Sequence, residues 1–160
     1  MTTILTPALL LVITTVLYAG YNVLVKASAG AIPETAQTTI HLTITLQIAA
    51  LATSLVFAAV LWGRGVNTFH ASQSALAWAV LAGICIGGAE IAYFYLFGGV
   101  QGHSPMSAGI AIPTVVTGTI IISMFAAALM FHEIIGWKQI AGAGLVIAGI
   151  AVMFHGRSGV

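Results

Sequence analysis

Glu90 is the residue of this sequence best placed to do chemistry, because it is an acidic side chain inside the apolar run SALAWAVLAGICIGGAEIAYFYLFG. At the rise of an α-helix it would lie roughly 5 Å beyond the middle of that run. A carboxyl group at such a depth in a membrane costs at least a few kcal/mol, so we expect it to face the protein interior and to have a function. It is suited to hold a proton and a cationic substrate alternately. The competing interpretation is a structural Glu, neutral or paired with a cation at a helix end, for which Lys26 is the candidate.

A second apolar run contains polar residues at intervals of four, namely Thr14, Tyr18, Asn22 and Lys26. Tyr21 lies next to this row in the sequence. A row of polar groups in contact with lipid is costly, so this row is expected to face a partner helix or a cavity. Asn22 and Tyr18 are therefore candidates to line the same cavity as Glu90.

Around Glu90 the spacing is that of one helical stripe, with small residues at one end and aromatic residues at the other: Gly83, Gly87, Glu90, Phe94 and Phe97. Tyr93 lies beside this stripe. The stripe has two interpretations: it lines a pathway, or it packs against another helix in the ordinary way. Two further apolar runs each contain a polar candidate for the same pathway: Gln47 in one, and Thr117, just after Pro113, in the other. Hydroxyl groups can also bond back to their own helix. The predicted substrate- or proton-binding residues are Glu90, Tyr93, Tyr18, Asn22, Gln47 and Thr117.

Other kinds of site lack support in the sequence. The five histidines, at positions 41, 70, 103, 132 and 155, fall in connections or near the ends of apolar runs, and no two have a metal-ligand spacing of three or four residues. The single cysteine, Cys85, gives no disulfide within one chain. No nucleophile elbow, phosphate loop or HExxH motif is present. We therefore expect no enzyme, no metal site and no cofactor.

The elements that must position these residues are transmembrane helices. Of the 160 residues, 60% are hydrophobic and 4% charged, against roughly 25% charged in a soluble domain. Runs of around 20 apolar residues suffice to cross the hydrocarbon core as helices. We predict an all-α integral membrane protein, one transmembrane domain over 1–160, with helices at approximately 6–27, 38–62, 74–98, 105–131 and 137–154. The first run has no preceding Lys or Arg and is longer than the core of a signal peptide, so it is interpreted as a span.

The orientation of the chain in the membrane is not decided by its charges. Five spans place the termini on opposite sides, with Trp62, Trp78 and Trp137 near helix ends on the N-terminal side, as expected of an interfacial aromatic belt. The basic residues divide evenly, with Arg64 and Lys138 on that side and Lys26 and Arg157 on the other. With no positive-inside bias, we expect insertion in both orientations or a single orientation fixed by some other factor.

The stretch SAGIAIPTVVTGTIIISMFAAALMFHEIIGWKQIAGAGLVIAGIAVM resembles the end of an EamA-type repeat of the drug/metabolite transporter superfamily. Its corresponding features are Pro113 in a small-residue helix, Glu133 before a short loop, and a Gly/Ala-rich last helix. The segment LYAGYNVLVKAS is similar to the first helix of that repeat. Most members resemble two fused five-helix repeats of opposite orientation, whereas this chain carries one. The resemblance therefore implies a half-transporter that works as an antiparallel homodimer in a bacterial inner membrane.

The predicted function is secondary transport by alternating access, exporting or exchanging a small metabolite, amino acid or organic cation. No Lys/Arg run for a nucleic acid is present. Two alternatives stay open. The first is a non-transporting membrane subunit, in which Glu90 tolerates replacement by Gln. The second is a lipid-handling flippase, which should carry basic residues at a lateral opening, and the chain has few.

Overall fold

The computed structural model describes residues 7–31, 36–66, 71–99 and 104–155, and within them the chain is all-helical. The helices are α1 (Pro7–Ala29), α2 (Ala36–Gly63), α3 (Gln73–Gly98), α4 (Ala108–Met130) and α5 (Trp137–His155). Each of the five is long and apolar enough to cross a membrane. The predicted helical class and multi-pass character are thereby confirmed, and the finer prediction of an EamA-like repeat stays a prediction.

The predicted beginning of the fourth helix at Pro105 is wrong, because α4 begins at Ala108. Ser107 precedes the helix with extended backbone angles (φ −71°, ψ 142°), and its carbonyl accepts from the amides of Ile110 and Ala111. Pro113, the proline inside the helix, lies in its first turns. The other predicted boundaries differ from the observed ones by at most two residues where the structure describes them.

Several helix ends have a local cause that the sequence carries. The Ser72 hydroxyl accepts a hydrogen bond from the Ala75 amide (3.1 Å) and thus caps the beginning of α3. Gly99 ends α3 with φ at 87°, a value that glycine adopts without strain. At the beginning of α5, the Gln139 side chain accepts from the Gly136 amide at 2.7 Å, half of a capping box.

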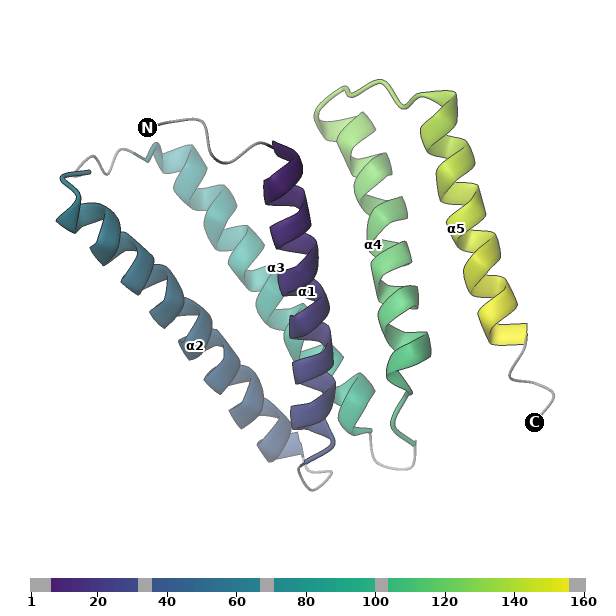
Figure 1. Cartoon of the computed structure of the whole chain (residues 1–160), viewed down its shortest axis with the longest axis horizontal. Helices are drawn as coiled ribbons and strands as arrows, with labels where there is room; N and C mark the ends of the chain where they lie inside the picture. The colour runs from purple at the N-terminus through teal and green to yellow at the C-terminus, as the bar shows by residue number, and fades with distance from the viewer. Residues whose placement is uncertain (1–6, 32–35, 67–70, 100–103, 156–160) are drawn as a thin grey trace. The chain divides into compact units, whose positions relative to one another are not determined.

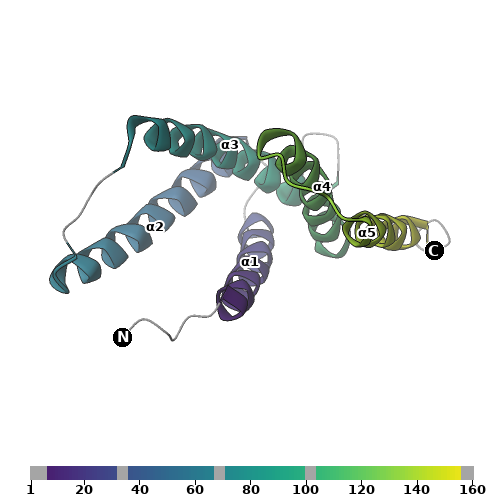
Figure 2. The ribbon, with the colours of Figure 1, turned by 90° about the horizontal axis from the view of Figure 1, so that it is seen from above.

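The helices form two compact units, residues 1–105 and 106–160, which are described separately. In the first unit α1 and α3 run parallel and α2 runs antiparallel to both (Figure 1). The N-terminal part of α2 lies close to the C-terminal part of α3, and from there the two helices diverge toward their connection (Figures 1 and 2). The first unit is therefore closed at one end and splayed at the other.

Burial in the first unit follows this arrangement. Among the residues that the structure describes in this unit, the buried side chains come from the end of α1, the beginning of α2 and the second half of α3: Val25, Ala29, Thr39, Thr43, Glu90, Tyr93, Phe94 and Phe97. Phe97 is the most deeply buried, with none of its surface exposed. At the splayed end Trp62 and Trp78 are 73% and 61% exposed, as an interfacial belt requires.

The second unit is the helical hairpin of α4 and α5, which pack against each other. Its buried residues are small, namely Ala111, Thr117 and Ala143. Small side chains let two helix backbones approach closely in lipid, which is the usual way in which membrane helices associate.

Candidate functional site

Three polar contacts join α1 to α3 at the closed end of the first unit, and together they form a ladder. The Tyr21 hydroxyl donates a hydrogen bond to Oε2 of Glu90. The Tyr93 hydroxyl donates to Oδ1 of Asn22 at 2.9 Å, and Lys26 Nζ donates to the Phe97 carbonyl at 3.1 Å. The paired residues differ in number by 69 or 71 in every case, as two parallel helices in fixed register require.

The first two rungs of the ladder are reciprocal. In each, a tyrosine of one helix donates to a carboxylate or amide oxygen of the other, so that each helix supplies one donor and one acceptor. The rings of Tyr21 and Tyr93 are stacked between these bonds, with centroids 6.5 Å apart and an angle of 16°. The ring of Tyr93 also packs against the ring of Phe97, with centroids 4.5 Å apart, so the ladder continues into the apolar core.

Glu90 lies where the packed end of the first unit gives way to the splayed end. It is 4.5 residues from the middle of α3, which is about 7 Å along the helix axis. Its side chain is 5% exposed, yet the residues of α3 before position 87 are all exposed. The carboxyl group is therefore enclosed, although Gly88, Ala89 and Ile91 beside it on α3 are exposed.

The predicted site residues separate into three groups. Glu90, Tyr93 and Asn22 are brought together in the ladder. Tyr18 is 60% exposed on α1 and touches the ladder by its ring, whose centroid is 6.4 Å from that of Tyr21 at an angle of 84°. Gln47 lies on α2 and Thr117 on α4, so neither belongs to the α1–α3 ladder.

Tyr21 belongs to the site and was not among the predicted residues. A pattern of strict intervals of four selects Tyr18, Asn22 and Lys26 and passes over Tyr21. A helix has 3.6 residues per turn, so the face toward a neighbour alternates intervals of three and four. Counting back from the buried Val25 and Ala29 in that way reaches Tyr21 as well as Asn22.

Lys26, near the end of α1, contacts the end of α3. Its ammonium group contacts a carbonyl in the last turn of α3 and lies 5.3 Å from the centre of the Phe97 ring. A cation at the C-terminal end of a helix interacts favourably with the helix dipole. Lys26 thus joins the ends of α1 and α3.

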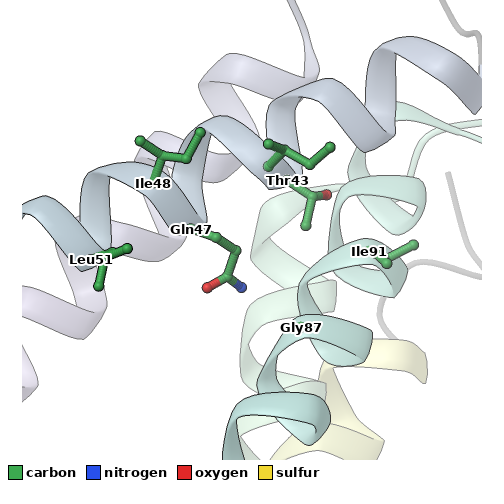
Figure 3. A pocket seen from close by; sticks show the side chains of 7 residues that line it. Thr43, Gln47, Ile48, Leu51, Gly87 and Ile91 are labelled. Atoms are coloured by element: carbon green, nitrogen blue, oxygen red, sulfur yellow. The ribbon is translucent and has the colours of Figure 1, made fainter.

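Gln47 faces a groove of about 360 Å³ between α2 and α3. The amide of its side chain points from α2 toward Gly87 on α3 (Figure 3). Its Nε2 is buried and has no hydrogen-bond partner within the described parts of the chain. Thr43, one turn away, has its hydroxyl donating to the Thr39 carbonyl at 3.0 Å.

Several hydroxyl groups inside the apolar helices bond to a carbonyl of their own helix. Ser54 donates to the Ala50 carbonyl at 3.1 Å, and Thr114 donates to the Ile110 carbonyl at 2.7 Å. Thr117 is buried within the α4–α5 unit, with 7% of its surface exposed.

The histidines at 70 and 103 lie outside the described residues. Within the residues described, no three His, Cys, Asp or Glu side chains gather in a way that could hold a metal ion. Cys85 is exposed on α3.

No protein-family model, curated protein or solved structure matches this chain. The resemblance to the EamA-type repeat therefore stays a prediction.

Proposed function

We propose that this multi-pass membrane protein is a secondary transporter with Glu90 as the group that exchanges a proton for a cationic part of the substrate. The observation that carries the proposal is the enclosed hydrogen bond from Tyr21 to Glu90. An acidic side chain in the membrane-spanning part of a protein marks a substrate or proton pathway in most cases. This one lies at the boundary between packed and splayed helices, where a substrate entering between the helices would meet it.

The shape of the first unit supports alternating access. Its three helices are packed at one end and diverge at the other. Helices that rock about such a packed end would open one side of the membrane and close the other, as inverted-repeat transporters do around a site near the midplane. In this proposal the Tyr21–Glu90 bond holds the enclosed state, and substrate or proton binding replaces it.

The transporter is proposed to be a homodimer, with the two copies in opposite orientations in a bacterial inner membrane. The support is the resemblance to one half of a two-repeat transporter together with the even division of Lys and Arg between the two sides. Inverting one copy places the Glu90 residues on opposite sides of the midplane. The substrate, a small metabolite, amino acid or organic cation, would then bind between them.

A second candidate is a non-transporting subunit, and the same hydrogen bond favours it. A Glu that is 5% exposed and bonded to Tyr21 has a structural partner already. In that case Glu90 fixes the register of α1 against α3 and binds no substrate.

Uptake into liposomes separates the two candidates. The purified chain is reconstituted and offered a mixture of amino acids, choline and tetramethylammonium, which do not readily cross a bilayer unaided, and the contents of the liposomes are analysed by mass spectrometry against protein-free liposomes. Transport predicts that the wild type accumulates at least one of these compounds, that Glu90→Gln loses the accumulation, and that Glu133→Gln retains it. Glu133 is the matched control because it is an exposed acidic residue in the α4–α5 connection. Equal accumulation by Glu90→Gln and the wild type would assign Glu90 a structural role.

A further inference from the structure

The groove between α2 and α3 is separate from the ladder, although both use α3. Glu90, Tyr93 and Phe97 face α1, whereas Gly87 and Ile91 line the groove on the side of α2. On α2 the groove is lined by Gln47 and by the aliphatic side chains of Ile44, Ile48 and Leu51. Its lining therefore contains no charged residue and is apolar except for Gln47 and Thr43.

Gln47 leaves one hydrogen-bonding requirement open in this apolar groove. Its Nε2 is buried with no acceptor in the part of the chain that the structure describes. A buried donor without a partner costs roughly 1–3 kcal/mol, so an acceptor beside Nε2 is expected to favour binding. The Thr43 hydroxyl proton is already used in the bond to Thr39. The groove thus presents one uncommitted donor group, the Nε2 nitrogen with its two N–H bonds, and favours a ligand with an acceptor.

Space for the acceptor lies over Gly87, toward which the Gln47 amide points (Figure 3). A Cβ atom built on Gly87 would meet nothing within 4 Å. The groove has a volume of about 360 Å³ and is open on its outer side, where Ile48 and Leu51 are 61% and 60% exposed.

The depth of the groove decides where its ligand comes from. Gln47 is 2.5 residues from the middle of α2 and Gly87 is 1.5 residues from the middle of α3, about 4 and 2 Å along the helix axes. The ester groups of phospholipids lie at the edges of a hydrocarbon core about 30 Å thick, and cannot supply an acceptor near its centre. A helix of a second copy offers mainly carbonyls that are already bonded within that helix.

We propose that the α2–α3 groove binds a neutral, largely apolar small molecule with one carbonyl-type acceptor, which Gln47 holds over Gly87. The chemical class is that of a compact ketone, ester or amide that partitions into the membrane. The absence of charge in the lining excludes a cation or a carboxylate as the preferred ligand. This site is independent of the proposed transport function, because its recognition group and its ligand chemistry differ from those of Glu90.

Photolabelling with benzophenone, a neutral aromatic ketone, tests the proposal on the full chain in lipid nanodiscs. Irradiation attaches the probe to nearby C–H bonds, and mass spectrometry locates the modified residues. We expect saturable labelling at Ile48 and Ile91, and competition by fluorenone at about fivefold lower concentration than by fluorene, which has the same rings without the carbonyl. Gln47→Leu should make the two competitors equal. Gly87→Leu should reduce labelling at both positions to background.

Two controls keep the result interpretable. Ser54→Ala, on an exposed part of α2, should leave the labelling unchanged, and thermal unfolding of each variant shows whether it is folded. Labelling that never saturates, or equal competition by fluorenone and fluorene in the wild type, would mean that lipid alone fills the groove. Labelling that appears only when the protein is diluted in lipid would mean that a second copy covers it. No labelling at any dilution would mean that protein covers it permanently, and each of these outcomes overturns the proposal.

Discussion

The hydrogen bond from Tyr21 to Glu90 is expected to contribute measurably to the free energy of unfolding. Tyr21→Phe removes the donor and leaves a carboxyl group that is 5% exposed without that partner. An unsatisfied buried polar group costs about 1–3 kcal/mol. Because Glu90 lies about 7 Å from the middle of α3, water cannot readily replace the hydroxyl. We expect Tyr21→Phe to destabilise the protein by about 1–2 kcal/mol.

The partner substitution is expected to behave differently. Glu90→Met keeps the length of the side chain and removes the acceptor, and a half-buried Tyr21 can turn its hydroxyl elsewhere. When both partners are replaced by apolar groups of similar shape, the result is close to neutral. The double variant should therefore be more stable than Tyr21→Phe alone, with a coupling free energy of about 1–2 kcal/mol between the two positions.

The measurement is a double-mutant cycle in lipid–detergent micelles, with unfolding followed in increasing dodecyl sulfate. Tyr18→Phe is the matched control, because Tyr18 is 60% exposed and its ring contact with Tyr21 survives the loss of the hydroxyl. It should couple to Glu90→Met by less than about 0.3 kcal/mol. The second rung, Tyr93→Phe with Asn22→Leu, should couple by about 0.6 kcal/mol, the average for hydrogen bonds between membrane helices. Additive effects of Tyr21→Phe and Glu90→Met would refute the reasoning.

Three further predictions concern packing, orientation and assembly. Phe97→Ala should destabilise the first unit by about 3 kcal/mol, because the ring is fully buried, while Phe97→Leu costs roughly half as much by the same unfolding assay. Reporters fused to the C-terminus should give signal on both sides of the membrane, and two added Lys residues beside Arg64 should restrict the signal to one side. If exposed Gly144 lies in the dimer contact, Gly144→Leu should lower the crosslinked dimer yield while Val146→Leu does not, and equal yields would count against that contact.

The number and extent of the helices could be predicted from the sequence because the thickness of the membrane fixes how long an apolar run must be. Pro105 was the exception. A proline is common in the first turn of a helix, so nothing in the pattern distinguished it from Ser107 as the start of α4.

The partners within the site were harder to predict than the helices. The depth of Glu90 in its apolar run predicts an interior residue. Tyr93 is predicted by the helical stripe around Glu90, and Asn22 by the polar row of the first run, and the structure brings all three together. Which helices pack together could not be predicted, because in lipid the outer faces of helices are as apolar as the inner faces. The bond between Tyr21 and Glu90 depends on the register of α1 against α3, and the assignment of Gln47 to a different groove depends on where α2 diverges from α3.

Proton movement is the most direct test of the claim that Glu90 exchanges a proton for substrate. Liposomes that contain the protein and a pH-sensitive dye are given the same mixture of amino acids, choline and tetramethylammonium, and the internal pH is followed against that of protein-free liposomes. The proposal predicts a pH change for the wild type and for Glu133→Gln, and none for Glu90→Gln. A pH change in Glu90→Gln equal to that of the wild type would contradict it.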